Sequence, residues 1–264
     1  MNASDLSTRV SVTVEPSEGS PHVLAAMQLA DAVGLPFIAK LDDITTPMTL
    51  VRTGDQLELR VLQGDPALVG GHPIAIDLTQ LDTRSGPGRA LRQPLLKAVG
   101  LRKGEPRPTV FDATAGFGED AWLLASMGCH VTAAERSPVV AALLRDALRR
   151  AAEREPTTAS LLRVIVGDSI TLLRDWPSET PRPSTVYLDP MFPTGRKTAE
   201  RKPMRVLRQL IGDDVDSAAL LTAAIETADR RVVVKRPSRA PTVAGREPTH
   251  VQRGKSVRYD VYIV

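Results

Sequence analysis

One stretch, residues 109–136, constrains the fold of this chain more than any other. It opens with a short β-rich run that ends in Asp112, and a turn of small residues, Ala-Thr-Ala-Gly-Phe-Gly, follows. A helical segment over 119–127 and a second apolar run that ends in Glu135 complete it. A strand, a glycine-rich turn, a helix and a strand ending in an acid form the first half of a nucleotide-binding α/β fold.

The residue types in this stretch suit a ligand that carries polar groups. Gly116 and Gly118 have no Cβ atom, so the backbone of the turn can approach a ligand closely. The first N–H groups of the following helix lack partners inside the helix and can face polar ligand atoms. Glu135 follows Asp112 by 23 residues, about where such folds place the carboxylate that binds a ribose diol. We therefore expect Gly116, Gly118 and Glu135 to bind a cofactor.

Asp112 selects among the nucleotides that this fold can bind. It stands four residues before Gly116, in the pattern Asp-x-x-x-Gly-x-Gly. A carboxylate there would repel a pyrophosphate, whereas S-adenosylmethionine has no phosphate and carries a sulfonium and an α-ammonium group. The pattern resembles the first motif of class I methyltransferases and predicts Asp112 as a cofactor-binding residue. Residues 116–121 also fit the loose dinucleotide fingerprint Gly-x-Gly-x-x-Ala, so another glycine-rich α/β protein remains an open alternative here.

Length and composition bound the remaining choices. The 264 residues suffice for one large α/β domain, or for one of about 160 residues with a smaller domain beside it. The single cysteine excludes an internal disulfide, which agrees with a reducing, cytoplasmic location. The four histidines are scattered without the spacing of metal ligands, so we expect no metal site. No apolar run reaches membrane-spanning length, so we expect no membrane segment.

The net charge of +3 is unevenly distributed. Residues 191–264 contain 15 Lys and Arg against 8 Asp and Glu, whereas residues 1–190 contain 19 against 23. A basic last third favours a polyanionic substrate near one face, although a solvated basic surface explains the charge equally well. Several of these cations could hold phosphates with an affinity that falls with salt. They are Arg196, Lys197, Arg201, Lys202, Arg205 and Arg208.

The N-terminal part of the chain has the pattern of a small α+β module. Alternating and helical spacings predict strands at 9–14, 50–51, 56–62 and 73–78, and a helix at 22–33 that ends at a glycine. A basic, glycine-rich loop around 83–89 then marks a domain boundary. We expect a module over residues 1–84, with a possible part in docking a substrate, and a second domain over residues 85–264.

The second domain continues to alternate strands and helices. After the first unit, the sequence predicts strands at 161–166, 185–188, 231–234 and 257–264, and helices at 91–99, 139–152, 170–174 and 217–228. A Pro- and Gly-rich loop is expected over 240–256. This order predicts an α/β, Rossmann-like class I methyltransferase fold, with a mostly parallel seven-stranded sheet closed by an antiparallel hairpin. Asp168, after the third of these strands, can accept from an adenine amine or cap the next helix, and both roles are compatible.

A second informative site follows the strand at 185–188. There a carboxylate, a rigid proline and an aromatic ring resemble the Asn/Asp-Pro-Pro-aromatic motif of amino-group methyltransferases. An exocyclic base amine is a poor nucleophile because its lone pair is delocalised into the ring. Asp189 and the Pro190 carbonyl can accept the hydrogens of such an amine, and Phe192 can stack on the base. We expect these three residues to be catalytic; a proline-rich loop with a buried Phe192 is the alternative.

Five strings of residues together point to one family. They are Asp112-Ala-Thr-Ala-Gly-Phe-Gly-Glu-Asp120, Glu135-Arg-Ser-Pro-Val-Val-Ala-Ala-Leu-Leu144, Val186-Tyr-Leu-Asp-Pro-Met-Phe-Pro193, Met204-Arg-Val206 and Val232-Val-Val-Lys-Arg-Pro237. Over residues 85–264 the chain resembles the RsmJ family of bacterial 16S ribosomal RNA guanine-N2 methyltransferases, whereas the N-terminal module matches that family poorly. The resemblance implies S-adenosylmethionine as the methyl donor, and a guanosine of 16S ribosomal RNA, free or in the 30S subunit, as the target.

The resemblance also implies roles for single residues. The family usually has an arginine where this chain has Glu119. The cofactor would be bound by Glu119, Asp120, Glu135, Arg136, Asp168, Ser169 and Asp189.

The sequence leaves three functions open. The first is an S-adenosylmethionine-dependent guanine-N2 methyltransferase acting on 16S ribosomal RNA. The second is an NAD-dependent oxidoreductase, which rests on the loose glycine fingerprint. The third is a non-catalytic RNA-binding or ribosome-assembly protein, which rests on the basic last third of the chain. The modified guanosine, the state of the substrate and the oligomeric state stay open in all three.

Overall fold

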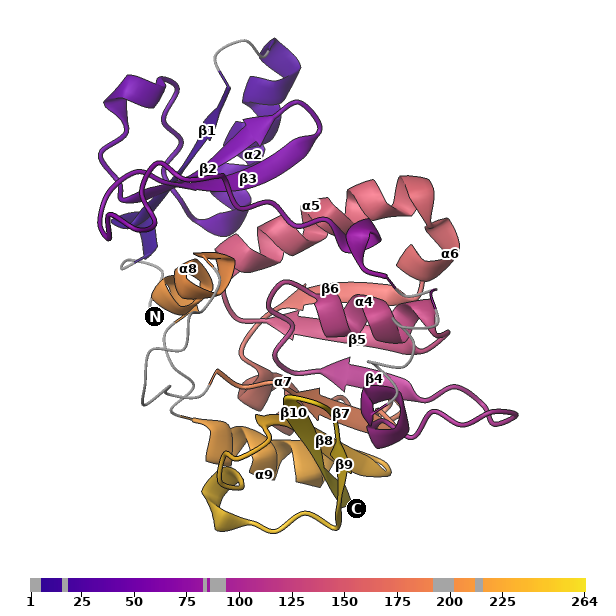
Figure 1. Ribbon diagram of the computed structural model, residues 1–264. Helices are drawn as coiled ribbons and strands as arrows, with labels where there is room; N and C mark the ends of the chain where they lie inside the picture. Colours follow the sequence, from indigo (N-terminus) through magenta and orange to yellow (C-terminus); the bar gives the residue numbers. More distant parts are fainter. Residues whose placement is uncertain (1–5, 16–18, 83–84, 86–93, 192–201, 212–215) are drawn as a thin grey trace.

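The computed structural model describes residues 6–15, 19–82, 85, 94–191, 202–211 and 216–264. A three-stranded sheet near the N-terminus contains, in spatial order, β1 (Val10–Val14), β2 (Met48–Thr53) and β3 (Gln56–Val61). A larger sheet contains seven strands. They are β4 (Thr109–Asp112), β5 (His130–Glu135), β6 (Leu162–Val166), β7 (Thr185–Leu188), β8 (Arg231–Pro237), β9 (His250–Arg253) and β10 (Val257–Ile263). Figure 1 shows the small sheet above the large one.

The large sheet has the expected Rossmann-like architecture. Its strand order is β6-β5-β4-β7-β8-β10-β9. The pairs from β6 to β8 are parallel, and β10 runs antiparallel to both β8 and β9. The predicted fold class is therefore confirmed. Strand order reverses between β4 and β7, and ligands of such folds bind beyond the carboxyl ends of the strands at this kind of switch point.

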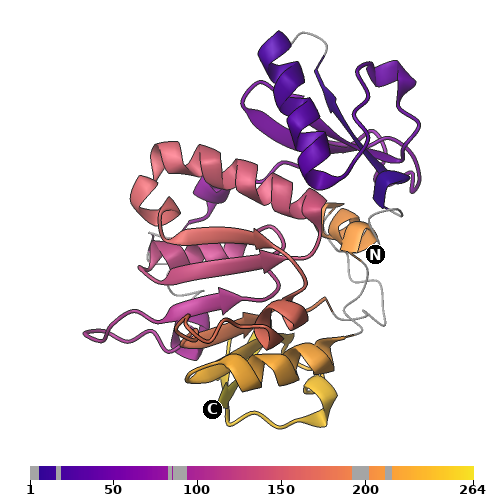
Figure 2. The same ribbon diagram turned by 180° about the vertical axis from the view of Figure 1, so that it is seen from behind.

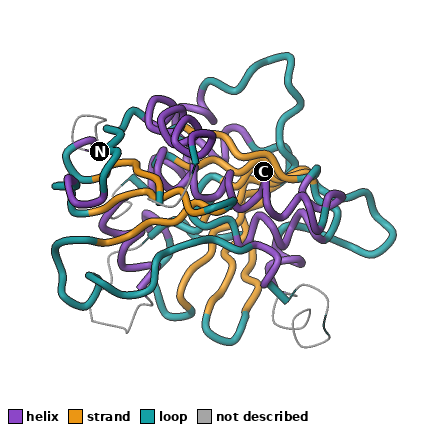
Figure 3. Tube along the Cα trace, turned by 90° about the horizontal axis from the view of Figure 1, so that it is seen from above, coloured by secondary structure: helices purple, strands orange, loops and turns teal. Residues whose placement is uncertain are grey.

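Helices cover both faces of the large sheet, as Figure 3 shows from above. One face packs against α4 (Glu119–Ser126) and α5 (Pro138–Arg154), and the other against α7 (Ser169–Arg174) and α9 (Ser217–Thr227). Successive residues of a strand point to opposite faces. In β4, Val110 accordingly lies in the first apolar cluster and Phe111 in the second. Burial on both faces explains why these strands are nearly continuous apolar runs.

The small sheet packs on the large domain through α5. Helix α2 (Ser20–Val33) accompanies β1, and β3 contacts α5. Asp146 of α5 is 7% exposed; it accepts a hydrogen bond from the backbone N–H of Leu57 at 3.0 Å and one from Arg150 at 2.9 Å. A single cluster of buried apolar side chains contains residues from both sheets and includes Leu6 near the N-terminus and Val261 of β10. The two sheets therefore share a core.

Three expectations from the sequence differ from the structure. Residues 73–78 form no regular strand: Ile74 makes a single bridge to Leu59, and a 3₁₀ helix follows at Leu78–Gln80. The loop expected over 240–256 contains the strand β9. The sequence pattern did not predict this strand because none of its four residues is fully buried. The basic segment before residue 211 contains α8 (Lys202–Ile211), which the sequence did not predict.

Within the described ranges, no helix is long and apolar enough to cross a membrane.

Candidate active site

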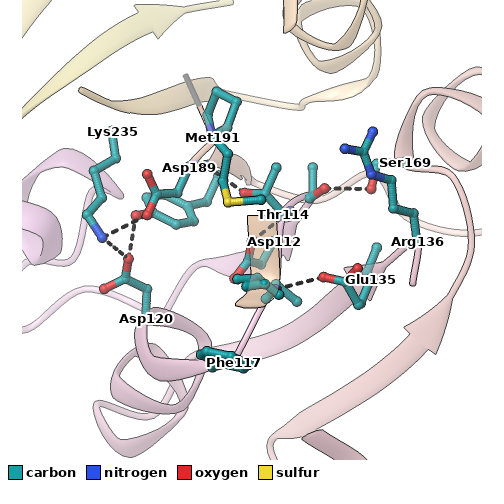
Figure 4. Close-up of a pocket in the computed structure, with 18 of the residues that line it drawn as sticks. Asp112, Thr114, Phe117, Asp120, Glu135, Arg136, Ser169, Asp189, Met191 and Lys235 are labelled. Carbon is teal, nitrogen blue, oxygen red and sulfur yellow. Dashed lines mark hydrogen bonds and ion pairs between the residues drawn. The ribbon is translucent and has the colours of Figure 1, made fainter. Parts of the chain in front are cut away.

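A cavity of about 580 Å³ lies at the carboxyl ends of the strands where strand order reverses. Its volume falls within the range of roughly 300–1,000 Å³ that small-molecule sites have. The cavity brings together every predicted catalytic or cofactor-binding residue that the structure describes, and Figure 4 shows several of them. They are Asp112, Gly116, Gly118, Glu119, Asp120, Glu135, Arg136, Asp168, Ser169, Asp189 and Pro190. The predicted residues Phe192, Arg196, Lys197 and Arg201 lie outside the described part of the chain.

The glycine turn aims the start of α4 at the cavity. Gly116 and Gly118 have φ angles of 52° and 77°, which side chains rarely allow. A Cβ atom on Gly118 would also collide with Leu144 of α5. Both glycines are therefore needed for the turn, and the first N–H groups of α4 face the cavity without competing side chains.

Glu135 joins two loops at the end of β5. Its side chain is buried; one carboxylate oxygen accepts from the Gly116 N–H at 3.0 Å and the other from the Ser137 N–H at 2.7 Å. A carboxylate offers about four lone-pair positions, more than these two hydrogen bonds use. This arrangement suits the predicted grip on a ribose diol.

Asp112 is a buried carboxyl group, 1% exposed, at the end of β4. It accepts a hydrogen bond from the Thr114 N–H at 3.0 Å. The pKa of Asp112 is raised to about 8, mainly by burial; the Thr114 bond lowers it, Asp120 and Asp189 raise it, and Lys235 lowers it. A cationic ligand beside Asp112 would favour the ionised form, which suits a sulfonium or ammonium group.

The remaining predicted cofactor residues also have structural partners. Asp168 accepts from the Thr171 N–H at 2.9 Å and caps α7, so the capping role is observed while its side chain still lines the cavity. The Ser169 hydroxyl donates to the Ala113 carbonyl at 2.7 Å. Arg136 lies 3.7 Å from Asp216, the residue before α9. These contacts fix the cavity wall that would face an adenosine.

A cluster around Asp189 includes residues that the sequence did not single out. The Asp189 backbone N–H donates to the Thr114 hydroxyl at 2.6 Å. The Lys235 ammonium lies 2.9 Å from the Asp189 carboxylate and 2.8 Å from that of Asp120, which also accepts from the Tyr187 hydroxyl at 2.6 Å. In the sequence, Lys235 could have been found because it directly follows an apolar run, as Asp189 does. Because β8 pairs with β7, the two residues lie side by side.

Helix α8 forms a further wall of the cavity. Pro203, Met204, Leu207 and Arg208 of this helix line the cavity, although most of the other lining residues lie elsewhere in the sequence. Figures 1 and 2 show α8 against the N-terminal module. Lys202 donates to the His72 carbonyl at 3.0 Å, Arg205 pairs with Asp65, and the Gln209 carbonyl accepts from Arg9 at 2.8 Å. The module therefore supports a wall of the site.

The volume of the cavity and the carboxyl groups that line it are compatible with S-adenosylmethionine, which has a cationic end and a ribose diol. Among the described residues, no group of three or more His, Cys, Asp or Glu side chains could hold a metal ion.

Comparison with known proteins identifies relatives of the whole chain. Residues 29–264 match the family model described as "Putative SAM-dependent methyltransferase". A "Ribosomal RNA small subunit methyltransferase J" from Ectopseudomonas mendocina is 42% identical over 246 residues, which cover 91% of this chain and 90% of the relative. The protein of the same name from Pseudomonas paraeruginosa is 45% identical over 243 residues, which cover 90% and 89%.

A crystal structure gives the same answer for the fold. The SAM-dependent methyltransferase NGO1261 from Neisseria gonorrhoeae superposes with a TM-score of 0.73 at 30% identity, over 96% of this chain and 95% of that one. The family match extends well upstream of residue 85, so the expectation that the N-terminal module lies outside the resemblance was too narrow. S-adenosylmethionine is the methyl donor of this family, which favours the first of the three functions over an oxidoreductase or a non-catalytic protein. The chain belongs to the ribosomal RNA small subunit methyltransferase J family of SAM-dependent methyltransferases.

Proposed function

We propose that this protein methylates the exocyclic N2 amine of a guanosine in 16S ribosomal RNA. The names of its relatives support small-subunit ribosomal RNA as the substrate. The observation that carries the proposal is the shared cavity of Glu135 and Asp189. It places a carboxylate suited to a nucleoside cofactor close to one suited to an amine acceptor.

When bound, S-adenosylmethionine would supply an electrophilic methyl group to the amine nitrogen, with its sulfur as the leaving group that keeps the electron pair of the C–S bond, and the amine would release one proton to water. The chain itself binds and orients the reactants. Asp112 would face the cationic end of the donor, Glu135 its ribose, and Asp168 its adenine. Glu119, Asp120, Arg136 and Ser169 would complete the pocket.

Asp189 and Pro190 would hold the acceptor amine. A carboxylate oxygen and a backbone carbonyl both accept N–H hydrogens, and accepting them favours a more tetrahedral, more nucleophilic nitrogen. Thr114 fixes the backbone of Asp189. We assign Phe192 the stacking role on the base that its position after Pro190 suggests. Correct orientation of two reactants can supply several kcal/mol, up to roughly 7–11 in model systems.

The RNA phosphates would contact the basic last third of the chain. The target guanosine would leave its base stack to reach the cavity, as bases do in other enzymes that modify them. Because ribosomal RNA is assembled in the cytoplasm, we place the reaction there, on 16S RNA or on the 30S subunit.

The direct test is the Asp189→Ala variant. Because it removes the acceptor for the amine and keeps the ribose site, we expect methyl transfer to 16S RNA or 30S subunits to fall at least about 10²-fold. Binding of S-adenosylhomocysteine, measured by calorimetry, should persist within a few-fold. Mapping the methylated nucleotide with the wild-type protein identifies the guanosine.

Two results would contradict the proposal. One is full methyl transfer by Asp189→Ala. The other is a wild-type protein that modifies a ring nitrogen or a ribose hydroxyl instead of a guanine amine.

A further inference from the structure

Lys235 places a positive charge between two carboxylates that come from different parts of the fold. Asp120 lies in the first turn of α4, on the side of the predicted cofactor, and Asp189 lies at the end of β7, on the side of the predicted base. The Lys235 ammonium is 2.8 Å from the first and 2.9 Å from the second (Figure 4). It thus connects the two halves of the cavity.

The surroundings of Lys235 make this contact strong and specific. Its side chain is 25% exposed, that of Asp120 24%, and that of Asp189 41%, so solvent screens the three groups only in part. Burial alone lowers the pKa of Lys235, but Asp189 and Asp120 together raise it above its usual value. Lys235 is therefore charged at neutral pH.

The other side of the cluster fixes the orientation of Asp120. Tyr187 of β7 donates its hydroxyl to the same oxygen of Asp120 that contacts Lys235. Burial raises the pKa of Tyr187 well above its usual value, and Asp120 and Asp189 raise it further, so this hydroxyl keeps its proton. Asp120 thus contacts both a neutral donor and a cation. It holds in place the ammonium group that pairs with Asp189.

We propose that Lys235 is a positioning residue, which keeps the Asp189 carboxylate ionised and in one orientation so that it accepts hydrogen bonds from the guanine amine. The inference rests on the proposed function and assigns Lys235 no contact with the reacting atoms. An ionised carboxylate has acceptor sites alone, whereas a protonated one carries a hydroxyl that would point a proton at the amine.

The charged and titratable groups around Asp189 show why a cation is needed. Asp112 of β4 and Asp120 of α4 bring two further carboxyl groups, and Tyr187 of β7 and Tyr259 of β10 bring phenols. Burial, followed by Asp120, raises the pKa of Tyr259 to about 12, so neither phenol supplies charge near neutral pH. The ammonium of Lys235 offsets the negative charge that Asp120 brings close to Asp189.

The test compares Lys235→Met, Lys235→Arg, Asp189→Asn and the double variant Lys235→Met with Asp189→Asn. Lys103→Met is the matched control, since Lys103 is an exposed lysine before β4 that does not line the cavity and lies outside the basic last third of the chain. Single-turnover methyl transfer to 30S subunits is measured from pH 5.5 to 9. S-adenosylhomocysteine affinity and thermal unfolding show whether each variant folds and keeps its cofactor site.

We expect Lys235→Met to lower the single-turnover rate near pH 6.5 by about 10²-fold, as small misplacements in active sites can. Its acidic limb should move up by about one pH unit or more, because a neighbouring opposite charge is lost. Lys235→Arg, which keeps the charge and the donors, should recover part of the rate. Adding Lys235→Met to Asp189→Asn should cost little further, because the effect passes through Asp189. Lys103→Met should behave as the wild type.

A readout independent of turnover separates this inference from the proposed function. The ¹³Cγ resonance of Asp189, assigned by its loss in Asp189→Asn, should titrate at higher pH in Lys235→Met than in the wild type. If the wild type methylates RNA but Lys235→Met shows an unchanged pH profile and an unchanged titration, the role of Lys235 is wrong. Fully additive losses in the double variant would also refute it. If the wild type fails to methylate RNA while the titration shifts, the proposed function is wrong instead.

Discussion

Asp112 links ligand binding to pH through a single buried carboxyl group. Its raised pKa of about 8 means that it carries a proton at neutral pH in the ligand-free protein. A cationic ligand stabilises the ionised form and so lowers the pKa in the complex. Binding then releases a proton, and linkage requires that affinity rise with pH up to about 8 and level off above it.

The prediction is therefore a pH-dependent affinity for S-adenosylmethionine. We expect it to rise by up to about tenfold per pH unit below the pKa of Asp112, when measured by calorimetry between pH 6 and 9. S-adenosylhomocysteine lacks the sulfonium and serves as the control for the amino group that both ligands share. In Asp112→Asn the difference between the two ligands should no longer change with pH. An identical pH dependence in that variant would show that another group titrates.

At the scale of residues, the sequence predicted the groups that end strands. Asp112, Glu135 and Asp189 each follow an apolar run, and parallel strands bring such ends to one edge. Lys235 follows an apolar run in the same way, but its charge made it look like part of the basic surface. Its true partners depend on which strands are neighbours, and strand order is a property of the whole sheet.

At the scale of elements, α8 is a helix that the sequence pattern did not predict. Its buried residues Val206, Leu207 and Leu210 have helical spacing, but the neighbouring basic residues made the segment look like a solvated basic stretch. Its position over the cavity follows from contacts with residues far away in sequence, such as Asp65. No local signal contains that information.

Leu207 provides the test of α8 as a wall of the site. It is 5% exposed, and its Cδ2 lies 3.7 Å from the point that a Cβ of Gly116 would occupy. Leu207→Ala should loosen α8 over the glycine turn, because buried Leu to Ala changes typically cost 2–5 kcal/mol. We expect roughly tenfold weaker binding of S-adenosylhomocysteine by calorimetry. Gln209→Ala, on the exposed side of the same helix, should leave affinity unchanged; equal losses in the two variants would show that the packing of Leu207 is not responsible.

At the scale of the whole molecule, we propose that residues 1–84 and 85–264 are distinct in sheet structure but unfold as one unit. The shared apolar cluster and the contacts of Asp146 support this proposal. Beside Arg150, the side chains of Arg52 and Arg149 approach Asp146 at 3.6 and 3.5 Å. Removing one partner of a buried charged group typically costs 3–5 kcal/mol, since the others lose their counter-charge.

Asp146→Ala is the corresponding variant. In urea unfolding followed by circular dichroism, we expect one transition at a lower midpoint, with a loss of about 3 kcal/mol. Glu153→Ala provides the control, because Glu153 pairs with Arg149 at an exposed position of the same helix and such pairs contribute about 0–1 kcal/mol. Two separate transitions in the wild type would show that the module and the domain unfold independently.

The distribution of charge also belongs to this scale. Residues 1–84 contain five Lys and Arg against eleven Asp and Glu, so the module repels phosphates while the last third attracts them. The module therefore supports α8 and the core more readily than it supplies the main electrostatic contact with RNA.

The shared core has a consequence for how the chain is made. Translation delivers the N-terminal module before α5 and α8 exist, yet β3 packs on α5, and Arg9 and Asp65 contact α8. Part of the apolar surface of the nascent module therefore stays uncovered on the ribosome until at least residue 154 has emerged. A cell that makes this protein must shield that surface from aggregation at least while residues 85–154 are being added.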